Sequence, residues 1–294
     1  MRKGFGVALS VLGGFLVTLA LLGQFWAPGQ LEKTPLDVDS TTLLSGTATL
    51  SNGTDTDTFP VRAFSITHAD SERSDSDVVV FQSSSCLVKD EGGIDSCVSA
   101  DDPDERLISA STDDFATDRV TALAVDDPQY LPPSAEEKQG LVNKWPFNAE
   151  QETYPYWDGL AGEAVDATFD RVEDVGDLQT YVYRVLVDDA PIELSPGIPG
   201  TYSTDKSIWI DPTTGSIVKQ TESQQRLDDN GDPFLILNLA FTEDQVEANA
   251  DDAGSNARSL NLVSSTVPLI GFIVGIPLLI AGIALQVLGR RRAV

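Results

Sequence analysis

The sequence predicts an α+β protein in which β-structure predominates: an antiparallel, barrel-like exported domain with a few helices, flanked by N- and C-terminal transmembrane helices. Three observations carry this prediction. Each end of the chain holds a long run without charged residues, which is typical of a membrane span. Short runs of alternating or β-branched residues fill the region between them, and turn residues separate these runs.

The first uncharged run covers residues 4–26. At about 1.5 Å per residue, roughly 20 residues cross a hydrocarbon core about 30 Å thick. A cleavable signal peptide is the alternative, because Arg2 and Lys3 supply a basic start. Its apolar stretch has about 7 to 15 residues and ends at a small-x-small site. This run is longer and ends at Trp26, so we predict a retained transmembrane helix.

The second uncharged run covers residues 267–288 and is followed by Arg290–Arg292. Basic residues beside a span stay in the cytoplasm. We therefore expect a two-pass protein of the plasma membrane, with residues 1–3 and the basic tail 289–294 cytoplasmic. Residues 27–266 then form an extracytoplasmic domain.

Small residues recur along both runs and predict that the two helices pack on each other, because small residues let helix backbones approach closely. Ordinary glycine richness of membrane helices is the alternative interpretation. The residues concerned are Gly6, Ser10, Gly14, Thr18, Gly271 and Gly275.

The exported region is strongly acidic. Five of the 19 basic residues flank the two runs, which leaves 14 against all 46 acidic residues and a net charge of −32. Such a field repels nucleic acid, so no nucleic-acid partner is expected. About 240 residues suffice for one large core, and we predict a single domain.

Cys86 and Cys97 are the only cysteines, with ten residues between them around Gly92 and Gly93. This spacing fits two strands that face each other across a loop, and an exported pair of cysteines favours a disulfide. A metal site would need more ligands than His68, the single histidine, supplies. We therefore predict a disulfide, no metal and no cofactor.

Four segments have the composition or the alternation of strands: 46–50, 61–67, 78–81 and 179–187. The last is expected to end at Asp188–Pro191, because proline cannot donate to a strand ladder.

Two hairpins are expected next to each other. Residues 207–220 surround a turn at Asp211–Gly215, and residues 220–241 surround an Asn-Gly turn within Asp228–Asp232. Capping-box patterns at Ser134–Glu137 and Thr242–Gln245 predict two helices, the second over about 243–253.

Sequence patterns of catalysis do not stand out. The nucleophile elbow, the P-loop, the zinc-protease helix and the dinucleotide fingerprint do not occur in the sequence. His68 is interpreted as a surface residue, and carboxylates are too common for their spacing to select a catalytic pair. The acidic turn at 228–232 lacks the spacing of a calcium loop and is interpreted as a solvated turn. No catalytic residue is proposed, and we do not expect an enzyme.

The segment from 143 to 158 concentrates aromatic residues beside prolines. Aromatic side chains bury a large area, so this segment either fills the core or lines the mouth of an apolar cavity. If it lines a cavity, the candidate ligand contacts are Trp145, Phe147, Tyr154, Tyr156 and Trp157.

Several segments carry a resemblance to a known family: Asn143–Phe147 with Tyr154–Asp158, Pro199–Tyr202 and Ile208–Pro212. With the two terminal spans, they resemble an actinobacterial two-span envelope family of unknown function, labelled the porin PorA family. That family is distantly similar to the scavenger-receptor class B and lysosomal integral membrane group. The resemblance implies a β-rich barrel with an apolar tunnel for lipids.

From this resemblance we expect a membrane-tethered protein that binds or transfers an envelope lipid or glycolipid outside the plasma membrane. The alternative is a non-catalytic scaffold whose partners are membrane proteins of envelope biosynthesis. A porin-like role ranks behind both, because so acidic a domain cannot present an apolar outer band to lipid.

Overall fold

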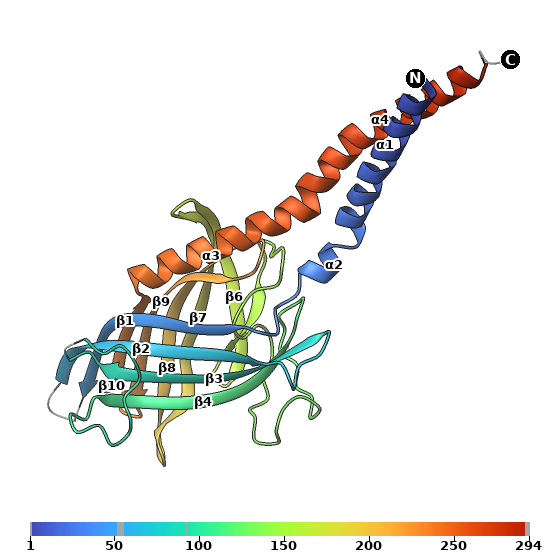
Figure 1. Ribbon diagram of the computed structural model, residues 1–294. Coiled ribbons are helices and arrows are strands. Elements are labelled where there is room, and N and C mark those ends of the chain that lie inside the picture. The colour runs from blue at the N-terminus through green and yellow to red at the C-terminus, as the bar shows by residue number, and fades with distance from the viewer. Residues whose placement is uncertain (1, 52–55, 92, 292–294) are drawn as a thin grey trace. The chain divides into compact units, whose positions relative to one another are not determined.

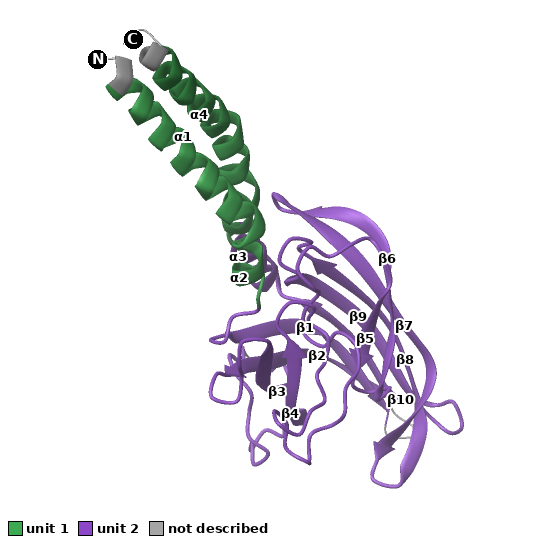
Figure 2. Ribbon diagram, turned by 90° about the vertical axis from the view of Figure 1, so that its right-hand side faces the viewer, with its two compact units in different colours: residues 1–33, 255–294 green, residues 34–254 purple. Residues whose placement is uncertain are grey.

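The computed structural model describes residues 2–51, 56–91 and 93–291, which fall into two compact units. Residues 1–33 and 255–294 form a helical unit, and residues 34–254 form a β unit (Figure 2). Gly92 of the predicted turn, and residues 1 and 292–294 of the predicted cytoplasmic ends, lie outside the described residues.

Two apolar helices make up most of the helical unit (Figure 1). α1 covers Arg2–Phe25, α4 covers Val267–Arg291, and the short α2 covers Pro28–Leu31. Each long helix holds a stretch that is long and apolar enough to cross a membrane. The start of α1 lies beside the end of α4, since Gln286 donates to the Gly6 carbonyl at 3.1 Å and to Ser10 Oγ at 2.7 Å.

The two helices pack on each other, as predicted, through glycine. A Cβ at Gly13 would lie 2.4 Å from the Leu279 backbone nitrogen, and one at Gly282 would lie 2.5 Å from Ser10. Gly14, which the prediction included, is not a close contact, because a Cβ there would lie 4.0 Å from the nearest atom of Leu279.

A third helix, α3 (Glu243–Asn261), runs through a π-helical turn, Leu262–Thr266, into α4. The predicted end at residue 253 is therefore wrong. Gly254 does not adopt a positive φ, and the first proline after it is Pro268, so nothing between them terminates the helix.

The β unit is one antiparallel sheet of ten strands that curls into a half-barrel (Figure 1). This confirms the predicted fold class. The strand order is β4-β3-β2-β1-β10-β9-β8-β7-β6-β5. The strands are β1 Asp39–Ser51, β2 Thr56–Asp70, β3 Val78–Lys89, β4 Leu107–Asp118, β5 Tyr154–Asp158, β6 Glu163–Val175, β7 Leu178–Ser195, β8 Ile198–Ile210, β9 Ile217–Asp228 and β10 Pro233–Phe241.

The four predicted strand segments lie in β1, β2, β3 and β7, and both predicted hairpins form, as β8–β9 and β9–β10. β7 nevertheless continues to Ser195 instead of ending before Pro191. Its pairing with β6 stops at Val185, and beyond that point it pairs only with β8. One side of the strand is therefore an edge, where a proline without an N–H is tolerated.

The gap between the outer strands β4 and β5 is bridged by the segment 119–153. Isolated bridges join Thr117 of β4 to Ala124, Leu123 to Leu141, and Leu141 to Tyr156 of β5. The helix predicted from Ser134–Glu137 does not form, so that prediction is wrong. Gly140 follows with a φ of +75°, the left-handed conformation that ends helices, so the sequence after Ser134 has room for little more than a single turn.

The disulfide between Cys86 and Cys97 is confirmed, with a Cα–Cα distance of 6.0 Å. Cys86 lies in β3, whereas Cys97 lies in a loop, so the predicted pair of facing strands is wrong at its second member. The bridge attaches the loop to the apolar cluster around Phe64 and Val88, through Ile94.

Removing this bridge gives a first testable prediction. Replacing both cysteines with serine is expected to lower the free energy of unfolding by about 2 to 3 kcal/mol, because the bridge no longer restricts the unfolded chain. Urea unfolding of the full chain in detergent, compared with the unmodified protein, measures the loss. An unchanged midpoint would contradict the prediction.

Candidate functional site

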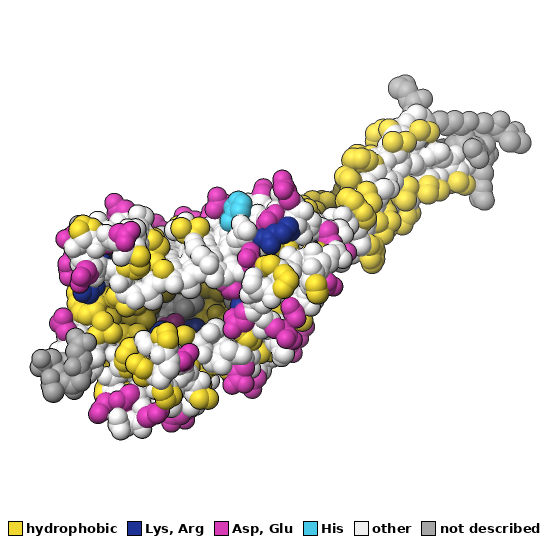
Figure 3. Space-filling model, turned by 90° about the horizontal axis from the view of Figure 1, so that it is seen from below, with side chains coloured by type: hydrophobic (Ala, Val, Ile, Leu, Met, Phe, Trp, Pro, Cys, Tyr) yellow, Lys and Arg dark blue, Asp and Glu magenta, His cyan; other side chains and the backbone are white. Residues whose placement is uncertain are grey.

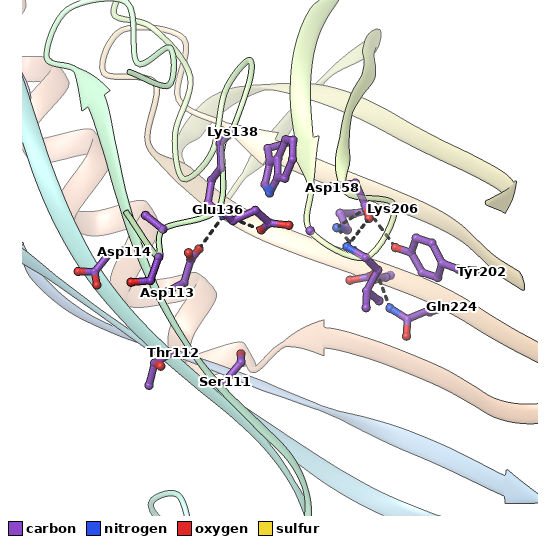
Figure 4. A pocket seen from close by; sticks show the side chains of 16 residues that line it. Ser111, Thr112, Asp113, Asp114, Glu136, Lys138, Asp158, Tyr202, Lys206 and Gln224 are labelled. Atoms are coloured by element: carbon purple, nitrogen blue, oxygen red, sulfur yellow. Dashed lines mark hydrogen bonds and ion pairs between the residues drawn. The ribbon is translucent and has the colours of Figure 1, made fainter. Parts of the chain in front are cut away.

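A cavity of about 710 Å³ opens inside the curled sheet, between the outer strand β4 and the strands β5, β8 and β9. Figure 3 shows this part of the molecule hollowed on the face seen from below, and Figure 4 shows the lining side chains from close by. The lining is mostly polar: Ser111, Thr112, Asp113, Asp114, Ser134, Ala135, Glu136, Lys138, Trp157, Asp158, Gly159, Leu160, Tyr202, Lys206, Glu222 and Gln224.

One wall of the cavity is built around Lys138, which is only 6% exposed. Its ammonium lies 3.2 Å from Asp113 of β4 and 3.0 Å from Glu136. It also lies over the Trp157 ring, 5.2 Å from the ring centroid. The ion pairs attach the bridging segment to β4 and keep it extended, which accounts further for the missing helix.

The opposite wall is built around Lys206 of β8, which is 9% exposed. Its ammonium lies 3.7 Å from both Asp158 and Glu222. Burial by itself lowers the pKa of Lys206, but Tyr156, Glu222 and Asp158 more than reverse this and raise it above its ordinary value. Lys206 is therefore charged at neutral pH. Figure 4 shows this cluster across the cavity from Asp113, Glu136 and Lys138.

Strand alternation explains why these polar side chains share one face. Tyr202, Thr204 and Lys206 are two residues apart along β8 and are all buried. On the neighbouring strand β9, Glu222 pairs directly with Lys206, and Gln224 pairs with Thr204. Opposite charges at paired positions stabilise a sheet.

Asp158 is the best-satisfied carboxylate of the site and is 2% exposed. Its side chain accepts the backbone amides of Leu160 at 3.1 Å and Ala161 at 3.0 Å, and the Tyr202 hydroxyl at 3.1 Å. Burial, followed by the Asp158 charge, raises the pKa of Tyr202, so its hydroxyl stays protonated and donates. Asp158 thereby fixes the turn after β5 against β8.

The five aromatic candidates are divided between the core and the cavity. Trp145 and Tyr156 are buried in the main apolar cluster and stack on each other, with ring centroids 5.6 Å apart. Tyr154 packs against this cluster, and Phe147 is partly buried under Lys144. Of the five, Trp157 alone is among the cavity-lining residues. A ligand-contacting role for these residues stays a prediction.

Sequence reasoning missed Lys138, Lys206 and Glu222, which organise the site. A signal was present for Lys206, because it occupies an inward position between Thr204 and Ile208 in an alternating strand. That Lys206 pairs with Glu222 follows only from the register of the β8–β9 hairpin, which the sequence did not give. Within the described residues, no group of three or more His, Cys, Asp or Glu side chains is placed to hold a metal ion.

Lys144 lies outside the cavity and gives a pH-dependent prediction. Its ammonium lies 3.4 Å from Thr34 Oγ1 and 3.7 Å from the Phe147 ring centroid, and burial lowers its pKa to about 7. An unfolded lysine titrates near a pKa of about 10.4, so between these values the unfolded state binds more protons. Stability should therefore rise with pH from about 7 upwards.

Replacing Lys144 with methionine is expected to remove this rise. Urea unfolding of both proteins at several pH values between about 6.5 and 9.5 should show the variant gaining most at the lowest pH, because burial there opposes a charged lysine. Parallel pH profiles for the two proteins would contradict the prediction.

These features define a class: a protein with two apolar helices near its termini and a curled, half-barrel sheet that encloses a polar cavity. The family model described as Porin PorA matches residues 5–284, nearly the whole chain, so the protein belongs to the PorA porin family. No curated protein matches the chain. The helices and the family match are both consistent with a membrane protein.

The predicted lipid or glycolipid binding and transfer is wrong, because the family is a porin family. The cavity also differs from what that prediction required, since its lining is polar instead of apolar. The porin-like interpretation, which ranked behind the others, fits best. Its low rank assumed that the acidic domain must itself meet lipid, whereas α1 and α4 carry the exposed apolar side chains.

Proposed function

We propose that this protein is a porin-type protein that admits small water-soluble solutes across an envelope membrane. The single observation that carries the proposal is the family match over residues 5–284. The cavity supports it, because its polar lining suits contact with water-soluble solutes.

In this proposal α1 and α4 cross the membrane, with both of their terminal ends in the cytoplasm. The antiparallel contact between Gly6 and Gln286 supports a common side for the two ends. The sequence places Arg2, Lys3, Arg290 and Arg291 there, and basic residues beside a span favour the cytoplasm. Residues 34–254 then lie outside the plasma membrane.

One helix pair does not enclose a water-filled pore, because its backbones touch. A Cβ at Gly13 would lie 2.7 Å from the Gly275 carbonyl oxygen, which leaves no room for water between the helices. A pore formed by these helices therefore needs several copies of the chain, and their exposed leucine, isoleucine and phenylalanine side chains supply surfaces for contact with lipid or with other copies.

Planar-bilayer recording with the purified full chain tests the proposal. Stepwise conductance is expected, with cations preferred over anions, because the segment between the spans carries a net charge of −32. Gly14→Leu should keep the conductance, and Gly13→Leu should lose it, since of these two glycines it is Gly13 that lies in the helix contact. Recordings without steps from protein that keeps its disulfide and helix content would refute the proposal.

Several finer statements remain predictions within this proposal: the actinobacterial source, the distant likeness to the scavenger-receptor class B group, and the absence of enzymatic activity. A scaffold role with partners from envelope biosynthesis also stays a prediction. Co-purification of such membrane proteins with the full chain would support that role.

A further inference from the structure

The charged side chains that line the cavity already form ion pairs with other side chains of the protein. Asp113 and Glu136 contact Lys138, Asp158 and Glu222 contact Lys206, and Asp114 lies 3.1 Å from Arg73. Both lysines are almost completely buried, so neither offers a free positive charge. An anionic ligand would meet five carboxylates without an accessible counter-charge.

The cavity also binds a cationic ligand poorly, although its lining has more carboxylates than lysines. The carboxylates with the most exposed side chains are Glu136, at 53%, and Asp113, at 39%. Both already share Lys138 at 3.0 to 3.2 Å, and a charged ligand would have to compete with this buried ammonium. Breaking such a pair leaves an uncompensated charge, which is costly.

The cavity lining has hydrogen-bond donors and acceptors that are not paired with other groups of the protein. The hydroxyls of Thr112 and Ser134 are exposed and make no hydrogen bond within the described residues. A hydroxyl both donates and accepts, and a carboxylate has about four acceptor positions, so Asp113 and Glu136 keep acceptors beyond those given to Lys138. Trp157 and Leu160 add apolar surface to the same lining.

We propose that this cavity binds a neutral, water-soluble solute rich in hydroxyl groups, that is, a sugar. Sugar hydroxyls donate to Asp113 and Glu136 and exchange hydrogen bonds with Thr112 and Ser134, while a C–H face of the sugar ring lies against the exposed Leu160. The volume of about 710 Å³ falls within the range of about 300 to 1,000 Å³ that is usual for small-molecule sites. This inference rests on the proposed function and names the class of solute admitted.

Calorimetric titration of the purified full chain in detergent tests the inference with three probes: sucrose, spermidine and glucose 6-phosphate. Saturable sucrose binding is expected, with glucose 6-phosphate at least about tenfold weaker because of repulsion by the carboxylates. Sucrose affinity should change less than about twofold between low and high salt, since salt screens interactions between charges.

Two substitutions test the location. Ser134→Phe places a ring in the cavity and is expected to weaken sucrose binding at least about tenfold, whereas Gln139→Phe, on the same segment but outside the lining, should leave it unchanged. Glu136→Gln keeps a hydrogen-bonding side chain and should keep sucrose affinity within about threefold. The variant puts folding at little risk, because Asp113 still pairs with Lys138 and leaves no uncompensated charge.

The inference is overturned if spermidine binds more tightly than sucrose and loses affinity in Glu136→Gln, which would make the cavity a cation site. It is equally overturned if none of the probes binds saturably, or if Ser134→Phe and Gln139→Phe bind sucrose alike. Binding is measured without a bilayer, so sucrose binding by a protein that does not conduct refutes the porin proposal alone. Conductance without sucrose binding refutes this inference alone.

Discussion

Replacing Gly13 with leucine is expected to separate the two apolar helices. A Cβ at this position would lie 2.4 Å from the Leu279 nitrogen and 2.7 Å from the Gly275 carbonyl oxygen. Both are backbone atoms of α4, so no side-chain rotation relieves the clash. Helix association in lipid depends on close backbone packing, because the hydrophobic effect does not favour one helix surface over lipid.

Disulfide cross-linking in membranes measures this effect. The Cβ atoms of a cysteine at residue 6 and of one at residue 285 would start 3.2 Å apart, near the spacing of about 3.5 to 4.5 Å that a disulfide needs. The pair Gly6→Cys and Leu285→Cys should cross-link in the otherwise unmodified chain, and cross-linking should be almost abolished when Gly13→Leu is added.

Gly14→Leu is the matched control, since it adds the same side chain one residue further along α1. A Cβ at Gly14 would make only an ordinary contact, 4.0 Å from a methyl group of Leu279. Cross-linking should therefore persist in this variant. Equal cross-linking in Gly13→Leu and Gly14→Leu would show that the helices do not meet through Gly13.

The sequence predicted those parts of the fold that depend on local patterns. Uncharged length identified α1 and α4, alternation identified four strands, and Asn230-Gly231 identified the β9–β10 turn. The capping box at Ser134 gave a wrong prediction, because the long-range ion pair between Lys138 and Asp113 holds that segment extended. The continuation of β7 past Pro191 likewise depends on where β6 stops.

The cavity was harder to predict from the sequence, because its lining residues come from five separate segments of the chain. Lys138 and Asp113 are 25 positions apart in the chain, and their contact depends on the segment that bridges β4 and β5. The aromatic segment drew attention for its composition, yet Trp145 and Tyr156 fill the core. The aromatic composition predicted that these side chains bury a large area. It did not predict which of them fill the core and which line the cavity.

Replacing Lys206 with methionine is expected to destabilise the β unit strongly. Methionine has a similar reach but no charge, so Asp158 and Glu222 would remain at the buried wall without their shared ammonium. Removing one partner of a buried ionic cluster costs about 3 to 5 kcal/mol, because a charge is left uncompensated. Urea unfolding of the full chain in detergent, followed by tryptophan fluorescence, measures the loss.

A second substitution separates lost charge from lost packing. If the uncompensated carboxylate is the cause, adding Glu222→Gln to Lys206→Met should restore more than about 1 kcal/mol, because contacting residues couple by about 0.5 to 3 kcal/mol. Lys89→Met, which removes only a cation from 5.5 Å above the Phe59 ring, should cost less than about 1 kcal/mol. Were Lys206→Met as stable as Lys89→Met, Lys206 would not be what holds the two carboxylates in the wall.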